Sequence, residues 1–126
     1  MHVFEADLSE AAALPGELYD LVIADVPCTG SGTWGRTPEQ LYYFDPARIS
    51  RYASLQKKIA ANVINRVKKG GWLLYITCSV FRKENEEVVT FLQKEQRLDV
   101  VQMEWIKGYD RKADTLFATL LRKPTA

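Results

Sequence analysis

Two cysteines, Cys28 and Cys78, have the type and the setting that covalent chemistry needs. Cys28 stands in the stretch DVPCTGSGTW, directly after the apolar run that ends at Ala24, and Cys78 closes another apolar run within TCS. A free cysteine is most often a small buried hydrophobe, and either thiol alone is more simply explained that way. That explanation weakens when both thiols follow apolar runs beside carboxylate and hydroxyl side chains, because thiols in a cleft are candidates for nucleophilic catalysis.

One predicted helix lies between these cysteines, and a second follows Cys78. From Arg48 to Lys69 the apolar residues recur at spacings of three and four, which predicts a helix that begins at Asp45 and Pro46 and ends at Gly70. Acidic residues early in 83–96 and basic residues near its end favour a second helix, since they complement the helix dipole.

Five short apolar runs predict strands, and the last two are separated by a charged turn. These runs are 2–6, 21–25, 72–79, 98–106 and 114–123. Their order with the helices predicts an α/β fold with a mostly parallel sheet and a terminal antiparallel hairpin. The continuous run 21–25 is typical of a strand with both faces covered. Ligands of such sheets bind past the carboxyl ends of the strands, where Asp7, 25–32 and 77–79 fall.

A phosphate-binding loop, a phosphatase loop and a zinc site each agree poorly with the spacing of these residues. The segment GSGTWGRT, residues 30–37, approaches a phosphate-binding loop, but Arg36 holds the lysine position and Pro38 begins a poor helix. A phosphatase loop needs arginine six positions after its cysteine, where this chain has Trp34. Two scattered cysteines and His2 do not form a zinc set, so no metal is expected.

Composition sets the broad class of the protein. The 126 residues predict one domain, 1–126, and a formal net charge of +1 gives no strong basic field for nucleic acid. The basic residues around the first helix are explained either as phosphate contacts or, more simply, as a solvated face; they are Lys57, Lys58, Arg66, Lys68 and Lys69. Without a signal peptide or a membrane-spanning run, a cytoplasmic protein is expected.

Two motifs carry a resemblance to a known family. DVPCTGSG resembles the Asp-x-Pro-Cys-[Ser/Thr]-Gly-x-Gly motif, and TCSVFRKENEEVV resembles the Thr-Cys-Ser motif with its Asn-Glu helix, of the RNA cytosine-5 methyltransferases of the Sun/Fmu family. The motifs lie about fifty residues apart, as in that family, and DTLFATLLRK is similar to its closing strand. The resemblance implies a partial Rossmann-like class I methyltransferase sheet that lacks its first strands.

The resemblance also implies a role for each motif residue. Cys78 would add to carbon 6 of cytosine, which turns carbon 5 into a nucleophile, and Cys28 would serve the release step. Asp25 would hold the cytosine edge and stabilise the protonated ring nitrogen. Pro27 would stiffen the loop and leave its carbonyl free for the exocyclic amine, and Gly30 with Gly32 would allow the base to approach closely.

The methyl donor implied by the resemblance is S-adenosylmethionine, bound by Asp25 and by Asp7 near its adenine end. A lone aspartate such as Asp7 is otherwise most simply an N-cap. Asn85 and Glu86 would brace the Cys78 loop, unless they are solvated residues of the first helical turn. The implied partner is RNA, with ribosomal RNA expected ahead of transfer RNA, and no membrane.

The family's glycine-rich cofactor loop, its first two strands and its ribose-binding acid have no counterpart upstream of Asp25. The chain is therefore expected to be the C-terminal portion of a catalytic domain, with weak or no cofactor binding and uncertain activity. The strand 21–25 would leave an apolar edge open to a second copy of the chain, to residues 1–10 or to aggregation. The alternative function is a non-catalytic RNA-binding or assembly module that retains relic loops.

Overall fold

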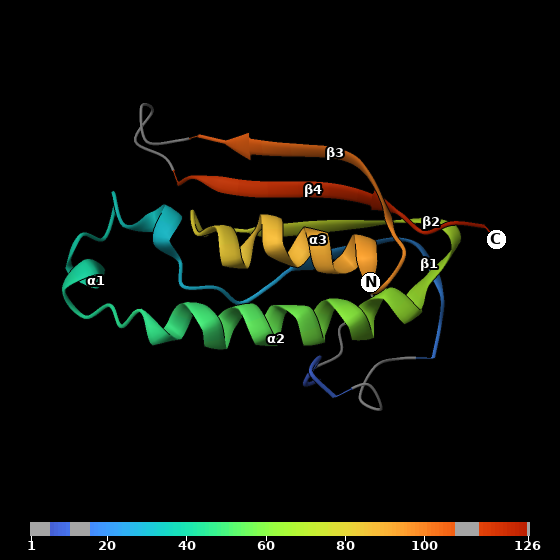
Figure 1. Ribbon diagram of the computed structural model, residues 1–126, viewed down its shortest axis with the longest axis horizontal. Coiled ribbons are helices and arrows are strands. Elements are labelled where there is room, and N and C mark those ends of the chain that lie inside the picture. The colour runs from blue at the N-terminus through green and yellow to red at the C-terminus, as the bar shows by residue number, and fades with distance from the viewer. Residues whose placement is uncertain (1–5, 11–15, 108–113, 126) are drawn as a thin grey trace.

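The computed structural model describes residues 6–10, 16–107 and 114–125, which form a four-stranded sheet with helices (Figure 1). The strands are β1 Tyr19–Asp25, β2 Val67–Thr77, β3 Asp99–Ile106 and β4 Leu116–Arg122. The α-helices are α1 Glu39–Tyr42, α2 Ala47–Val63 and α3 Glu86–Lys94, with short 3-10 turns η2 Ser31–Thr33, η3 Ile64–Arg66 and η4 Arg82–Glu84. No helix in these ranges has the length and apolar character needed to cross a bilayer.

The sheet is mixed, in the order β1-β2-β4-β3. Strands β1 and β2 pair in parallel, whereas β4 runs antiparallel to both β2 and β3. The α/β class and the terminal hairpin are thus confirmed, although parallel pairing among the described strands is confined to β1 and β2. The strand predicted over 2–6 lies outside the described residues except for Ala6, which is not in a strand.

The first long helix starts where the sequence predicts and ends earlier. The Asp45 carboxylate accepts a hydrogen bond from Ala47 N at 3.0 Å, as a residue at the helix start should. Helix α2 ends at Val63, because the chain tightens into η3 and then enters β2. Gly70, with φ 79°, is therefore not the helix stop; it lies in β2, near an irregularity in the β1–β2 register.

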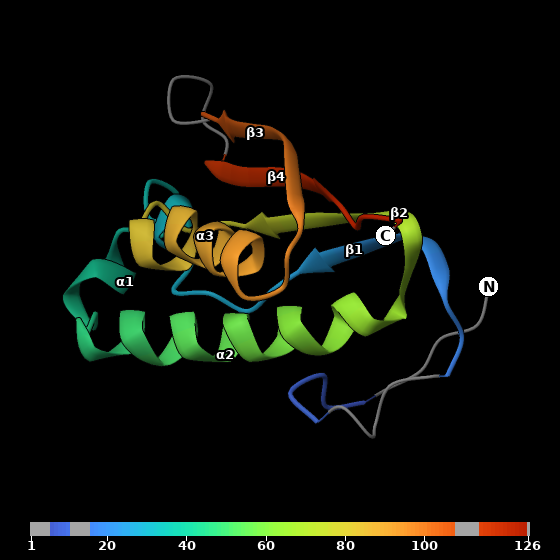
Figure 2. The ribbon, with the colours of Figure 1, turned by 45° about the vertical axis from the view of Figure 1, so that its right-hand side comes forward.

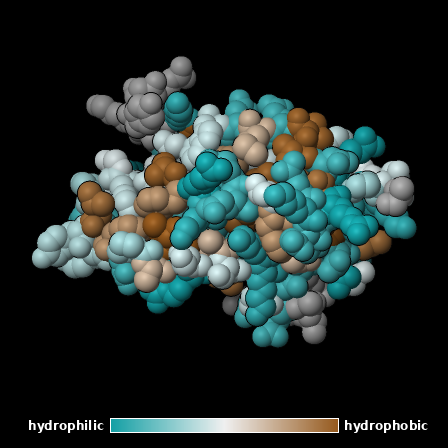
Figure 3. All heavy atoms as spheres, viewed as in Figure 1, coloured by the Kyte–Doolittle hydropathy of each residue, from teal (hydrophilic) through white to brown (hydrophobic). Residues whose placement is uncertain are grey.

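Helices α2 and α3 cover one face of the sheet (Figure 2). Alternate residues of β2 and β4 point into this layer, and both helices supply apolar side chains to the same core. Its fully or nearly fully buried members include Leu73, Tyr75, Phe117, Leu121, Val88 and Leu92. The outer surface on this side is mostly hydrophilic (Figure 3).

The other face of the sheet remains open in the part of the chain that the structure describes. Leu21, Leu74 and Leu120 line a hollow of about 280 Å³ there, and Leu21 and Ile23 are 50% and 61% exposed. The prediction that both faces of β1 are covered is therefore wrong for these residues, because the helices lie on one side only. Within the same ranges β1 pairs with β2 alone, so its outer edge is open, as expected.

This open apolar surface predicts self-association. Leu21→Lys places a charge on a half-exposed position of an edge strand, which should disfavour pairing with a second copy. We expect light scattering to give a larger mass for the native sequence, rising with concentration, than for Leu21→Lys. Tyr42→Lys, which alters an 86% exposed aromatic residue on α1, should behave like the native sequence. A native chain that stays monomeric at high concentration would contradict the prediction.

Candidate active site

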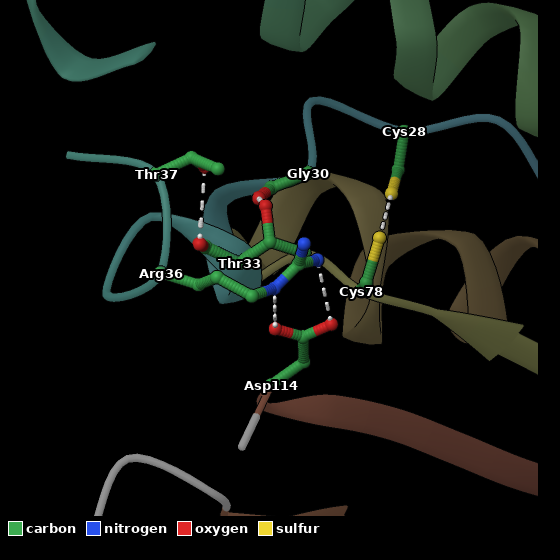
Figure 4. Close-up of polar contacts among 7 residues, drawn as sticks. All are labelled: Cys28, Gly30, Thr33, Arg36, Thr37, Cys78 and Asp114. Carbon is green, nitrogen blue, oxygen red and sulfur yellow. Dashed lines mark hydrogen bonds and ion pairs between the residues drawn. The ribbon is translucent and has the colours of Figure 1, made fainter. Parts of the chain in front are cut away.

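The two cysteines meet at the carboxyl edge of the parallel pair. Because β1 and β2 run in the same direction, the residues that follow them lie at one rim of the sheet. Cys28 follows β1, Cys78 follows β2, both are half-buried, and their Sγ atoms are 3.2 Å apart (Figure 4). Two thiols fifty positions apart in sequence therefore form one site.

The environment of Cys28 raises the pKa of its thiol. Burial, followed by the hydrogen bond with Cys78, raises the pKa of Cys28 to about 12. Cys28 therefore keeps its proton at neutral pH, and either sulfur of the pair can be the donor of the hydrogen bond between them. A thiol reacts as its thiolate, so Cys28 is a poor nucleophile at neutral pH.

The alkylation rate of Cys28 should show this raised pKa. We expect the rate of labelling by iodoacetamide at Cys28 to keep rising with pH through 10 and 11, where a thiol with the ordinary pKa has already levelled off. The rate is followed by peptide mass spectrometry, with circular dichroism at each pH to show that the chain is folded. A plateau near pH 9 would contradict the assignment.

Backbone packing fixes the loop after Cys28. Gly30 has φ 75°, a left-handed conformation that favours glycine, and its carbonyl accepts hydrogen bonds from the N–H and the hydroxyl of Thr33. Gly32 N donates to Cys78 O at 2.7 Å, and Thr115 N donates to Gly32 O at 3.0 Å. A Cβ on Gly32 would lie 2.2 Å from Thr115 O, so the protein's own backbone fills the side where a base was expected to approach.

Aromatic rings support the same loops. The Trp34 ring contacts Phe44 and Phe81 edge-on, with centroids 4.9 and 5.9 Å away, and Phe44 stacks on Phe81 at 5.6 Å. These three residues come from the loop after β1, the segment before α2 and the segment after β2. Their packing ties both cysteine loops to the start of α2.

The carbonyl of Pro27 is not free. It accepts a hydrogen bond from Gln56 Nε2 at 2.8 Å, so that the expectation of an unoccupied acceptor is wrong. The reason is that Gln56, on the buried face of α2, is fully enclosed and needs polar partners. One lone pair of the carbonyl remains for another donor.

The phosphate-loop interpretation of 30–37 finds no support in the geometry. Arg36, which holds the lysine position of that motif, donates two hydrogen bonds to the Asp114 carboxylate at 3.1 and 3.2 Å (Figure 4). The helix that follows, α1, has only four residues. Arg36 therefore joins the loop to the start of β4.

Asn85 braces the Cys78 loop, as the sequence predicts. Its Oδ1 accepts from the Thr77 hydroxyl at 2.5 Å, and its Nδ2 donates to Ser79 O at 2.8 Å. Glu86 does not share this role: its Oε1 is buried with no hydrogen-bond partner among the described residues. The polar run Glu84 to Glu86 passes from η4 into α3, and this turn directs Glu84 rather than Glu86 toward the loop.

Glu84 is the site residue that sequence reasoning missed. It is fully buried and accepts hydrogen bonds from Thr29, Ser79 and Gln56. A signal was present, because in the helix predicted over 83–96 Glu84 lies four residues before Val88 and shares its buried face. A carboxylate on an apolar stripe indicates a polar partner inside the protein.

A cavity of about 470 Å³ lies beside the carboxyl end of β1. Asp7, Asp25 and Pro27 line it together with apolar side chains that include Leu55 and Ile59. Hydrogen bonds from the hydroxyl and N–H of Ser9 hold the pKa of the exposed Asp7 below its usual range, so Asp7 caps a turn rather than a helix. Apolar walls, two carboxylates and this volume fit part of a nucleoside-sized ligand.

The basic residues do not gather at this rim. Lys57 lies over the Phe91 ring at 5.8 Å, and Lys68 pairs with Asp20 at 3.5 Å. Arg66, Lys68 and Lys69 fall at the start of β2, the opposite end of the sheet from the cysteines (Figure 1). Lys68 and Lys69 are exposed, which favours a solvated role for these two, whereas Arg66 ends η3 and its Nε is buried without a hydrogen-bond partner among the described residues. In the described ranges no three His, Cys, Asp or Glu residues lie together as a metal would need.

Comparisons with known proteins agree with the two motifs and the fold. The family model described as "16S rRNA methyltransferase RsmB/F" matches residues 1–121. The chain is 36% identical over 92 residues to a ribosomal RNA small subunit methyltransferase F of Shewanella loihica, covering 73% of this chain and 19% of that protein. It is 35% identical over 105 residues to a probable ribosomal RNA small subunit methyltransferase B of Synechocystis. That match covers 82% of this chain and 24% of that protein.

Two solved structures share the fold. PH0851 superposes with a TM-score of 0.78 at 31% identity, covering 85% of this chain and 27% of that one. NSun6 from Pyrococcus horikoshii, solved with SFG, superposes with a TM-score of 0.82 at 22% identity. The superposition covers 95% of this chain and 34% of that one. The chain thus spans about a fifth to a quarter of the length of these curated relatives. It belongs to the RsmB/F family of ribosomal RNA methyltransferases.

Proposed function

We propose that this chain carries the catalytic thiols of an S-adenosylmethionine-dependent methyltransferase that modifies carbon 5 of a cytosine in ribosomal RNA. The observation that carries the proposal is the 3.2 Å approach of the Cys28 and Cys78 sulfurs. Carbon 5 of cytosine is a weak nucleophile, and a thiolate that adds to carbon 6 activates it. A paired arrangement of one attacking and one protonated thiol suits such a reaction.

The proposed roles are those that the family resemblance implies, and the raised pKa of Cys28 supports them. The Cys78 thiolate forms a bond to carbon 6, and the electron pair of the 5,6 double bond becomes available at carbon 5. After methylation a base accepts the proton on carbon 5, the electron pair of that C–H bond re-forms the 5,6 double bond, and the sulfur–carbon 6 pair returns to Cys78 as its thiolate. Cys28 would be that base: it would first release its own proton to solvent, then accept the proton of carbon 5 as a thiolate. Once Cys78 is bonded to carbon 6 it has no S–H to donate and no negative charge, which weakens the causes that raise the pKa of Cys28.

The cavity beside β1 is the proposed place for the cofactor, which supplies an electrophilic methyl group when bound. Asp7 and Asp25 would accept hydrogen bonds from its polar groups, while Leu55 and Ile59 would pack against its flat surfaces. Asp25 would also face the cytosine edge, and the remaining lone pair of the Pro27 carbonyl would accept from the exocyclic amine. Gly30, whose left-handed backbone turns the chain two residues after Cys28, would lie near the bound cytosine.

Trapping the covalent intermediate tests the proposal. RNA that contains 5-azacytosine holds a thiolate adduct at carbon 6, so a band that resists denaturation should form with the native sequence and be lost in Cys78→Ser. The assay is run on the chain and on a chimera in which the part of this chain that matches the Shewanella relative over 92 residues replaces the corresponding segment of that relative. An adduct that survives Cys78→Ser in the chimera would refute the assignment. An RNA-binding module without catalysis would bind the RNA and form no adduct.

We expect the chain by itself to bind S-adenosylmethionine weakly or not detectably. The walls of the cavity come from residues 6–8, the end of β1 and one side of α2, so that they enclose only part of a ligand of this size. Calorimetry measures the constant directly. A micromolar dissociation constant, lost in Asp25→Ala, would contradict this prediction and show that the cavity is sufficient.

A further inference from the structure

Glu84 joins the two cysteine loops through a single carboxylate. Its Oε1 accepts from Thr29 N at 2.8 Å and its Oε2 from the Thr29 hydroxyl at 2.7 Å. The same Oε2 accepts a hydrogen bond from the Ser79 hydroxyl. Thr29 follows Cys28 and Ser79 follows Cys78, so Glu84 is bonded to the neighbour of each thiol.

Helix α2 adds a third contact to the same carboxylate. Gln56 Nε2 donates to Glu84 Oε1 at 3.1 Å and also to the Pro27 carbonyl at 2.8 Å. Pro27 precedes Cys28, so the residues on both sides of that cysteine are fixed, one directly and one through Gln56. The η4 backbone is held as well, since the Tyr75 hydroxyl donates to Glu84 O at 2.7 Å.

The free-energy cost of burying Glu84 indicates that this residue positions the two cysteine loops. Glu84 is 0% exposed, and none of the donors to its carboxylate is a cation. Enclosing a carboxylate without a counter-charge costs free energy that hydrogen bonds only partly offset, and an apolar residue would avoid that cost only by leaving the donors of Thr29, Ser79 and Gln56 without their acceptor. A carboxylate is purely an acceptor, whereas glutamine keeps one acceptor for the N–H groups of Thr29 and Gln56 and must donate to the Thr29 and Ser79 hydroxyls instead. The change therefore replaces two short charge-assisted hydrogen bonds with longer neutral ones.

We propose that Glu84 is a positioning residue that sets the separation of the Cys28 and Cys78 sulfurs. Its importance for catalysis rests on the proposed function, but its effect on the two thiols can be measured without RNA or cofactor. Failure of the methylation assays would therefore leave this inference standing, and its own failure would leave the methylation proposal untouched.

The equilibrium between the two thiols and a disulfide measures how well the fold holds the sulfurs together. With oxidised glutathione, one cysteine thiolate forms a mixed disulfide and releases one glutathione thiol. The second cysteine then attacks the mixed disulfide, which forms the Cys28–Cys78 bond and releases the second glutathione. Two electrons pass to glutathione, and the proportion of oxidised chain at each glutathione ratio gives the equilibrium constant.

Glu84→Gln is compared with Glu87→Gln, the same change at an exposed position nearby. We expect Glu84→Gln to lower the equilibrium constant at least about tenfold, which for two electrons is about 30 mV, and Glu87→Gln to leave it within about twofold. If Glu84 only stabilised the fold, Glu84→Gln would lower the midpoint of thermal unfolding. It would leave the dithiol–disulfide equilibrium constant unchanged, because most chains would still be folded at the temperature of the assay.

The proposal is overturned if Glu84→Gln is folded by circular dichroism and changes the constant by less than about twofold. It is overturned too if the native chain does not close the disulfide. Should Glu84→Gln fail to fold, Thr29→Val decides: it removes the hydroxyl donor to Oε2 and retains the N–H donor to Oε1. A fall of about threefold or more supports the proposal, and no fall overturns it.

Discussion

Replacing Gly32 with alanine is expected to destabilise the chain by about 3 kcal/mol, the upper end of the usual cost of overpacking. The added Cβ would lie 2.2 Å from Thr115 O and 2.7 Å from Cys78 O. Both are backbone atoms, so no side-chain rotation can make room. The clash also opposes the hydrogen bonds that join Gly32 to these two residues. Urea unfolding of the two chains measures the difference.

Gly35→Ala is the matched control for this prediction. It adds the same methyl group three residues later, where nothing lies within 4 Å of the added Cβ. A surface change of this kind normally alters the free energy of unfolding by about 0.5 kcal/mol or less. If Gly32→Ala were as stable as Gly35→Ala, the loop after Cys28 would not be packed against β4 as the structure has it.

The order of elements and the rim where both thiols lie could be predicted from the sequence because they depend on local patterns. Apolar periodicity marks the strands and helices, and two parallel strands must place their following residues at one edge. The end of α2 could not be placed, because the register of β2 against β1 is a tertiary contact that recruits Val67 into the sheet. Gly70 looked like a helix stop and is a left-handed residue within a strand.

The polar contacts of the site were harder to predict than its cysteines. Gln56 sits among apolar residues of α2, and sequence alone does not reveal that it reaches both Pro27 and Glu84. Gly32 looked like space for a base because glycine is small; the contact that requires it comes from Thr115, which is 83 positions away in the chain. Contacts of such separation depend on which strands become neighbours, here β2 and β4.

Removing either cysteine should have opposite effects on the covalent intermediate that the proposed mechanism forms with ordinary RNA. In the chimera with cofactor, Cys28→Ser should accumulate at least about tenfold more protein–RNA adduct than the native cysteine pair, because in that mechanism Cys78 would still attack while release is impaired. Cys78→Ser should form none, since the remaining thiol is the one whose raised pKa keeps it protonated. A denaturing gel with labelled RNA measures both. If Cys28→Ser formed no adduct and Cys78→Ser did, Cys28 would be the nucleophile. Its protonation at neutral pH would then have to be reversed by the RNA, since only a thiolate attacks carbon 6.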